Sequence, residues 1–179
     1  MIIERPGPFL TPEFLIRAAT QSWEIGAAAR LRHRTFVEEQ KIFKGHDRDE
    51  IDDFATALVA ISTMAGQADE VVGTVRIHET EPRVWWGSRL AVAPRYRRVG
   101  RLGAELIRLA VGAAHARGRL FLAYVQMHNV PLFEKLHWRS LGAQDLYGHP
   151  HMKMQADLDA YPPVADPARG WVSLTRSAA

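Results

Sequence analysis

Apolar residues along the chain form two kinds of segment, namely short runs rich in β-branched residues and longer stretches with helical spacing. The short runs predict seven strands, over residues 14–20, 56–64, 70–78, 83–92, 120–126, 139–143 and 152–158. Turn residues at 65–69 separate the second and third runs and predict an antiparallel hairpin. The segment Gly148-His149-Pro150 predicts a turn between the last two strands.

The first helix is expected over residues 22–40, with Ser22 as its N-cap. Its apolar side contains Trp23, Ala27 and Leu31, and after a slip in the spacing Phe36. This slip shows that the apolar pattern is helical but not of one constant period.

Two further helices follow. The second is expected from about Gly100 to a C-cap near Gly118. The third, over residues 130–138, is expected to be capped by Asn129, with Pro131 in its first turn, where a missing N–H costs nothing.

The order strand, helix, three strands, helix, strand, helix, two strands predicts a mixed α/β (α+β) domain with helices on the faces of one sheet. We expect this domain to span residues 14–158. An N-terminal arm with three prolines precedes it at 1–13. A Pro-rich tail follows at 159–179, and it is either docked by Trp171 or disordered.

Composition narrows the classes of function. The chain has 179 residues, which suits a single domain with a core of ordinary size. It contains no cysteine, which excludes disulfides, thiolate metal sites and cysteine nucleophiles. A net charge of +3 does not by itself indicate nucleic-acid binding. No apolar run approaches the length of a membrane span and no secretory signal is recognisable, so we expect a cytoplasmic protein with no membrane or nucleic-acid partner.

The segment 85–114 contains the strongest functional signal. A strand is followed by a basic, glycine-containing loop at 97–103 and then by a helix. The first N–H groups of a helix lack backbone partners and its dipole is positive there, while Gly100 and Gly103 permit close approach to a ligand. The segment therefore predicts a cradle for phosphate or pyrophosphate.

Two other interpretations of this segment stay open, a solvated helix start and a basic patch that faces RNA or DNA. Aromatic residues are sparse in the loop, with only Tyr96, which argues against binding of single-stranded nucleic acid.

The same segment resembles the acetyl-CoA motif of the GNAT N-acetyltransferase superfamily, (Gln/Arg)-x-x-Gly-x-(Gly/Ala). Arg97 and Gly100 match its first and fourth positions, whereas the sixth is Leu102 and the glycine comes one residue later, at Gly103. The segments LRHRTFVEEQ and YVQMHNVPLFEKLHW are similar to the ElaA-like branch, and the chain as a whole most resembles a bacterial GNAT type associated with nitrogen-starvation gene clusters. The first of these segments, with DEIDDFATALVAI and VVGTVRI, is also similar to acyl-homoserine-lactone synthases. The resemblance covers residues 14–158.

This resemblance implies a predominantly antiparallel sheet with helices on both faces. It also implies transfer of an acetyl or other acyl group from acetyl-CoA, or another acyl-CoA, to the amine of a small metabolite, without a metal and with a homodimer as one option. In such a protein the Val92 N–H would face the thioester oxygen. The residues implied in cofactor binding are Leu90, Ala91, Val92, Arg97, Arg98, Val99, Gly100, Arg101, Leu102, Gly103, Ala104, Asn129 and Phe133.

Amine acylation needs a base, because a substrate ammonium has a pKa near 10. The candidates are Glu38, Glu39, Asp52, Asp53 and His128. We favour Glu39 and His128 as catalytic residues, against their alternatives of a surface carboxylate and a structural histidine.

Protonation of the leaving thiolate has more than one candidate route. Phe133 occupies the position where many relatives carry a tyrosine that protonates the sulfur. Either Tyr147 or water acts, or the thiolate leaves unassisted, or catalysis has been lost. The pair His149 and His151 is interpreted as part of a turn and not as a metal site.

Three functions therefore compete: a CoA-dependent N-acyltransferase, an acyl-homoserine-lactone-type synthase, and a non-catalytic acyl-CoA-binding module. The first agrees best with the ordinary acetyltransferase pattern of residues 124–138. The replacement of the usual tyrosine by Phe133 keeps the third one open.

Overall fold

The computed structural model of the chain describes residues 13–99 and 101–175. The strands are β1 (Glu13–Ala18), β2 (Thr56–Met64), β3 (Gln67–Glu81), β4 (Val84–Val92), β5 (Leu120–Gln126), β6 (Trp138–Leu146), β7 (His149–Ala156) and β8 (Trp171–Leu174). They form one sheet in the order β6-β7-β5-β4-β3-β2-β1-β8. Neighbours are antiparallel except for β4 and β5, which are parallel. The predicted mixed α/β fold with a largely antiparallel sheet is confirmed.

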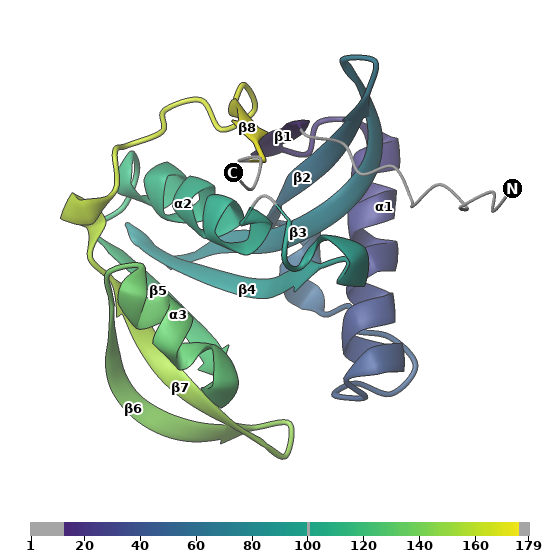
Figure 1. The fold of residues 1–179 in the computed structure, drawn as a ribbon. Coiled ribbons are helices and arrows are strands. Elements are labelled where there is room, and N and C mark those ends of the chain that lie inside the picture. The colour runs from purple at the N-terminus through teal and green to yellow at the C-terminus, as the bar shows by residue number, and fades with distance from the viewer. Residues whose placement is uncertain (1–12, 100, 176–179) are drawn as a thin grey trace, which may run out of the picture.

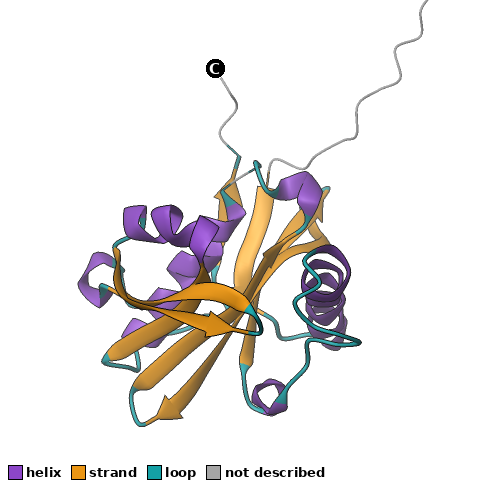
Figure 2. Cartoon of the chain, turned by 90° about the horizontal axis from the view of Figure 1, so that it is seen from below, coloured by secondary structure: helices purple, strands orange, loops and turns teal. Residues whose placement is uncertain are grey.

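Helices cover both faces of this sheet (Figures 1 and 2). They are α1 (Ser22–His33), α2 (Leu102–His115) and α3 (Val130–Lys135). The main core lies between the sheet and α2, where Leu106, Leu109 and Val111 are fully buried. A smaller cluster under α1 contains Ala28 and Val59. Helix α2 begins at Leu102, and Gly100, where we expected the helix to begin, lies outside the described residues, as do residues 1–12 of the expected N-terminal arm.

Helix α1 begins differently from the prediction. Ser22 is its first residue, so the expectation that Ser22 is the N-cap is wrong, and Gln21 takes that position. The fully buried carboxylate of Glu24 accepts hydrogen bonds from the N–H groups of Thr20 and Gln21 at 2.8 and 3.1 Å, and it pairs with Arg17. A buried carboxylate in the first turn therefore binds the amides of the N-cap and of the residue before it.

The slip expected between Leu31 and Phe36 has a structural cause. Helix α1 continues directly into a π-helical segment, Arg34–Glu39, in which the N–H of Gln40 reaches the carbonyl of Thr35. The wider turn lets Leu31 and Phe36, five positions apart, share one buried cluster. Trp23, by contrast, was expected on this side and is 42% exposed, so that part of the prediction is wrong.

The hairpin between β6 and β7 turns one step earlier than predicted. Its turn consists of Tyr147 and Gly148, with φ of 56° and 74°, while His149 and Pro150 already belong to β7. Tight antiparallel hairpins favour positive φ at both central residues, which proline is unable to adopt. The expected turn Gly148-His149-Pro150 is therefore wrong.

Helix α3 is shorter than predicted. It ends at Lys135, and Trp138, which we expected in the helix, is the buried first residue of β6. The reversal between them includes His137 in a left-handed conformation, with φ of 62°.

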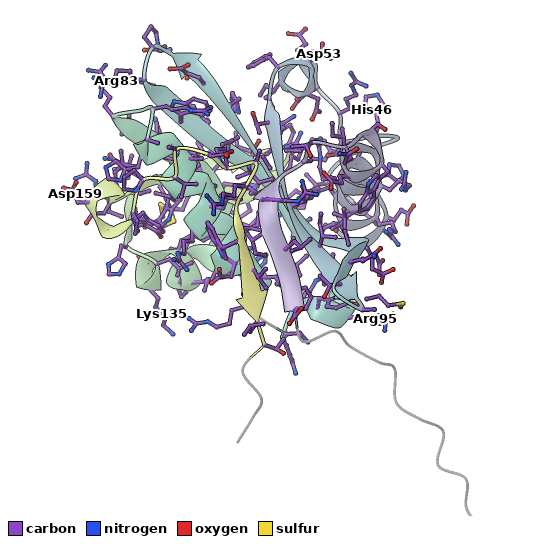
Figure 3. All side chains as sticks on the ribbon, turned by 90° about the horizontal axis from the view of Figure 1, so that it is seen from above. His46, Asp53, Arg83, Arg95, Lys135 and Asp159 are labelled. Carbon is purple, nitrogen blue, oxygen red and sulfur yellow. The ribbon has the colours of Figure 1, made fainter. Side chains whose placement is uncertain are left out.

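The sheet continues beyond residue 158. Strand β8 pairs antiparallel with β1, and the two lie side by side in Figure 3. The Nε1–H of Trp171 donates to Glu105 on α2 at 2.7 Å, and the Arg108 guanidinium lies over the Trp171 ring. Gly170 precedes β8 with φ of 52°, and a Cβ there would meet the Ile16 carbonyl oxygen at 1.8 Å.

Candidate active site

The site begins where two parallel strands separate. Strands β4 and β5 are paired from Val84 to Gly87 and from Leu120 to Ala123, and beyond these positions they diverge (Figure 1). A bulge in β4 accompanies the divergence, with Arg89 at a φ of 57° and a register shift against β3. The edge of β4 that faces β5 is thereby open to a ligand.

A cavity of about 980 Å³ follows this divergence, between the π-helical segment Arg34–Glu39 and the starts of α2 and α3. It brings together nine of the residues predicted to bind the cofactor: Leu90, Ala91, Val92, Arg97, Arg101, Gly103, Ala104, Asn129 and Phe133. Glu39 and His128, the two favoured catalytic candidates, line the same cavity. We call it the cofactor cavity. Residues from β4, the start of α2 and the start of α3 thus meet around one space, although they are distant in the sequence.

Three predicted cofactor residues do not line this cavity. Leu102 is 1% exposed and belongs to the core, Val99 packs against that core, and Arg98 is exposed. Gly100 lies outside the described residues. Any role for Val99 and Leu102 would therefore rest on their backbone amides and not on their side chains.

A second cavity of about 430 Å³ adjoins the first. The two share the residues Ile42, Leu90, Gln126, Asn129 and Phe133. Because Phe36, Phe43, Arg76 and Tyr124 line the second cavity, it opens on the α1 side of the sheet as well. We call it the inner cavity.

A comparison with family models identifies the chain. Residues 21–138 match the acetyltransferase (GNAT) family. The chain belongs to this family. Its members are acyltransferases that use acyl-CoA, which agrees with a large cavity beside the start of α2.

Solved structures agree with this assignment. A candidate N-acetyltransferase from Lactobacillus plantarum is 23% identical, with a TM-score of 0.70, and the match covers 81% of this chain and 98% of that chain. Escherichia coli ElaA is 18% identical with a TM-score of 0.65, covering 80% and 98%. The CoA-dependent acyl-homoserine lactone synthase BjaI, solved with SAM and isopentyl-CoA, is 18% identical with a TM-score of 0.64, covering 81% and 83%. At these identities the matches show a shared GNAT fold. No curated protein sequence matches the chain.

In this GNAT domain a bidentate ion pair connects Glu39 and Arg97. The two guanidinium nitrogens donate to the two carboxylate oxygens at 2.6 Å each, and the Arg97 Nε–H donates to the Val92 carbonyl at 3.0 Å. The hydrogen bonds from Arg97 lower the pKa of Glu39 below its ordinary value. Glu39 therefore stays ionised and bonded, which makes it a weak proton acceptor.

The other carboxylates proposed as bases are also paired. Glu38 lies 3.5 Å from His33 on the surface, and Asp53 pairs with Arg48 at 2.8 Å, where both side chains are exposed. Figure 3 shows Asp53 at the periphery of the molecule. Neither Glu38 nor Asp53 lines the two cavities.

Asp52 belongs to a network of three arginines and three aspartates on the α1 side. The Arg32 guanidinium bonds Asp47 and Asp52, and Arg76 bonds Asp49 and Asp52 at 2.5 and 2.9 Å. Arg89 completes the network with bonds to the Asp47 carbonyl and to the Asp49 carboxylate, both at 3.1 Å.

This network fixes one wall of the inner cavity through Asp49, Arg76 and Arg89. Burial raises the pKa of Asp52, but bonds from Arg32 and from the Asp49 N–H, together with the charges of Arg32 and Arg76, lower it more. The net result is a pKa well below the usual range, so Asp52 does not take a proton near neutral pH.

Two histidines in the wall of the inner cavity were missed as candidate bases. His151, on β7, is 7% exposed and its Nδ1 lies 2.8 Å from the His149 carbonyl, which makes Nδ1 the donor and leaves Nε2 as the acceptor. His78, on β3, is 6% exposed and its Nδ1 has no partner within the described residues. Burial and the Arg76 charge lower the pKa of His78. The sequence pattern places His151 in a turn. Because β7 begins at His149, His151 is a strand residue, and its side chain lines the inner cavity.

Phe133 stands at the junction of the two cavities. It is 6% exposed and packs edge-on against Trp138, with ring centroids 5.0 Å apart. The position that the resemblance assigns to a tyrosine is thus inside the site, but its side chain has no proton to give. Tyr147, the alternative proton donor, lines the inner cavity and packs edge-on against Phe43, with ring centroids 4.7 Å apart.

Helices within residues 13–99 and 101–175 lack the length and apolar character that a bilayer crossing requires. In the same part of the chain, no three His, Asp or Glu side chains gather in a way that would hold a metal ion.

Proposed function

We propose that this protein transfers an acyl group from acyl-CoA to the amine of a small molecule. The observation that carries the proposal is the meeting of two cavities at the divergence of β4 and β5. One cavity has a basic rim at a helix start, as a nucleotide diphosphate requires, and the other is partly enclosed, as an acceptor and a reacting thioester require.

The donor would bind in the cofactor cavity. The first N–H groups of α2 would hold the pyrophosphate, with Arg101 at the rim and Gly103 leaving room beside the backbone. The pantetheine arm would lie along Leu90 and Val92 as an added strand. The Val92 N–H would then stabilise the oxyanion that forms on the thioester carbonyl.

The acceptor amine would reach the thioester from the inner cavity. His151 is the base that the geometry supports best, because its Nε2 is left as an acceptor in the wall of that cavity, opposite Gln126, which borders both cavities. It would take one proton from the ammonium, and the free amine would attack the carbonyl carbon.

Glu39 and His128 remain candidates of second rank. Both line the cofactor cavity, and Glu39 is bonded to Arg97. A base on that side would have to act through water along the pantetheine arm. The pH–rate profiles of variants at His151, Glu39 and His128 would show which of the three acts as the base.

The departing thiolate needs no strong acid, since a thiol pKa near 8.5 makes it a stable leaving group. Phe133 is unable to protonate it. Tyr147 in the wall of the inner cavity, or water, would supply the proton.

The test has two stages. Calorimetry with CoA should first show binding, and acetyl-CoA with a panel of small amines should then release free thiol in an amine-dependent way. Failure of CoA and of its acyl forms to bind would refute the proposed function. Binding without turnover on any amine would favour an acyl-CoA-binding module, and turnover only with S-adenosylmethionine would favour a homoserine-lactone-type synthase.

A further inference from the structure

The inner cavity passes through the sheet. Strand residues alternate between the two faces, so Arg76, Trp86 and Tyr124 point to the α1 side, whereas Val75 and Phe121 point to the α2 side. All five line the same cavity. This is possible because the parallel pairing of β4 and β5 ends at Gly87 and Ala123.

The two ends of this cavity differ in chemistry. The α1 end combines charged and polar side chains, including Asp49, Arg89 and His151, with apolar ones such as Phe36 and Phe43. The α2 end is formed by apolar side chains from α2, α3 and the strands: Val75, Ile107, Ala110, Phe121, Phe133 and Trp138. We call this end the apolar chamber. Each of its six residues belongs to the main core cluster.

The apolar chamber lies next to the position of the reacting thioester. Leu90, Asn129 and Phe133 border both cavities, so a pantetheine arm that follows β4 ends beside the chamber. The inner cavity has about 430 Å³ for the acceptor and the acyl group together, and the methyl of an acetyl group would reach few of the six apolar side chains at the α2 end. Protein interiors are close-packed, and an unfilled apolar space forfeits contacts that a longer chain would make.

We propose that the apolar chamber holds the acyl chain of the donor, and that the donor is a medium-length or branched acyl-CoA and not acetyl-CoA. This proposal rests on the proposed function. The acyl chain enters the α2 end while the amine approaches from the polar α1 end, so donor chain and acceptor occupy opposite faces of the sheet.

Phe133 supports this assignment independently. A tyrosine that protonates the sulfur would place a hydroxyl at the thioester, beside the chamber. The phenyl ring instead extends the apolar wall from the thioester into the chamber. The loss of a proton donor and the gain of acyl-chain contact thus come from the same substitution.

The experiment measures the affinity and kcat/KM of the full chain for CoA and for acetyl-, butanoyl-, hexanoyl- and octanoyl-CoA. Each added methylene that is buried should raise affinity or kcat/KM about fourfold, until the chamber is full. Ala110→Leu, which fills the chamber from α2, should remove this dependence on chain length. Ala113→Leu is the matched control, because Ala113 is as buried on the same helix but does not line the cavity.

The outcomes separate the two proposals. If CoA binds but acetyl-CoA and hexanoyl-CoA have equal affinity and equal kcat/KM, the apolar chamber does not hold the acyl chain. The proposed acyltransferase function would still stand. Binding of neither CoA nor any acyl-CoA would refute the proposed function itself. The wild-type series decides the matter even if Ala110→Leu does not fold, and loss of chain-length dependence in Ala113→Leu would also count against the chamber.

Discussion

Glu39 and Arg97 lie side by side in the wall of the cofactor cavity and share two hydrogen bonds of 2.6 Å. Glu39 ends the π-helical segment, and Arg97 follows the short turn after β4. The pair therefore connects the acceptor-side helix to the proposed phosphate cradle. It also places a negative charge beside the site where the CoA phosphates would bind.

Replacing Glu39 by glutamine should leave the pH–rate profile unchanged between pH 5 and 9. The pKa of Glu39 is lowered by Arg97, so this carboxyl is ionised throughout that range and releases no proton in it. Loss of its charge should tighten CoA binding by roughly fivefold at low salt, the effect of removing one like charge near a phosphate in water. Glu38→Gln, on the surface beside His33, is the control. Disappearance of the acidic limb in Glu39→Gln would instead identify Glu39 as the base.

His151→Asn should lower kcat/KM by about 10² to 10⁴, the usual contribution of a general base, and should remove the acidic limb of the pH–rate profile. His149→Asn, two residues away and exposed, should keep the wild-type kcat/KM and the acidic limb of the profile. CoA affinity should stay at the wild-type value in His151→Asn because His151, unlike His149, is not part of the cofactor cavity wall. A His151 variant with the wild-type profile would transfer the role to another residue.

Gly103→Asp should weaken CoA binding on the order of tenfold or more, because it puts a carboxylate beside the proposed pyrophosphate site. The change should not harm folding. A Cβ at this glycine meets nothing within 4 Å, and a carboxylate in the first turn is favourable to a helix. Gly103→Ala tests the added bulk alone. Equal CoA affinity in the aspartate and alanine variants would show that the phosphates bind elsewhere.

Asp52→Ala should reduce the free energy of unfolding by about 3 kcal/mol, since it leaves Arg32 and Arg76 buried without a shared partner. Urea unfolding at neutral pH measures this. Asp49→Asn changes the same network at its more exposed edge and should cost less.

The same variant should alter the acid dependence of stability. The pKa of Asp52 is lower in the folded chain than its unfolded value near 3.9, so its contribution is fully present above that value and is lost as the pH falls toward the folded pKa. Wild-type protein should therefore lose stability below about pH 4 more steeply than Asp52→Ala. Parallel curves for the two proteins would contradict the assigned ion pairs.

Much of the sheet could be predicted from local patterns. Runs such as 56–64 and 120–126 are apolar and β-branched enough to identify β2 and β5 without tertiary information. The phosphate cradle at the basic glycine-containing loop stays a prediction. Arg97, Arg101 and Gly103 do line one cavity.

What local patterns missed depends on distant contacts. Strand β8 has four residues in a Pro-rich segment and is a strand because β1 offers it an open edge. Local sequence places His151 beside a turn at Gly148-His149-Pro150. In the structure the hairpin reverses at Tyr147 and Gly148, so His151 belongs to β7. The pairing of Glu39 with Arg97 joins positions far apart in the sequence, and no local rule predicts it.

The pairing of β1 with β8 has a consequence for biosynthesis. Residues 13–18 emerge from the ribosome early, yet their outer hydrogen bonds are completed by residues 171–174, at the other end of the described chain. The sheet edge therefore remains open until residues 171–174 have been translated, which exposes it to pairing with other nascent chains. A tag or a truncation that displaces Trp171 would prolong this exposure and should show first as a lower soluble yield.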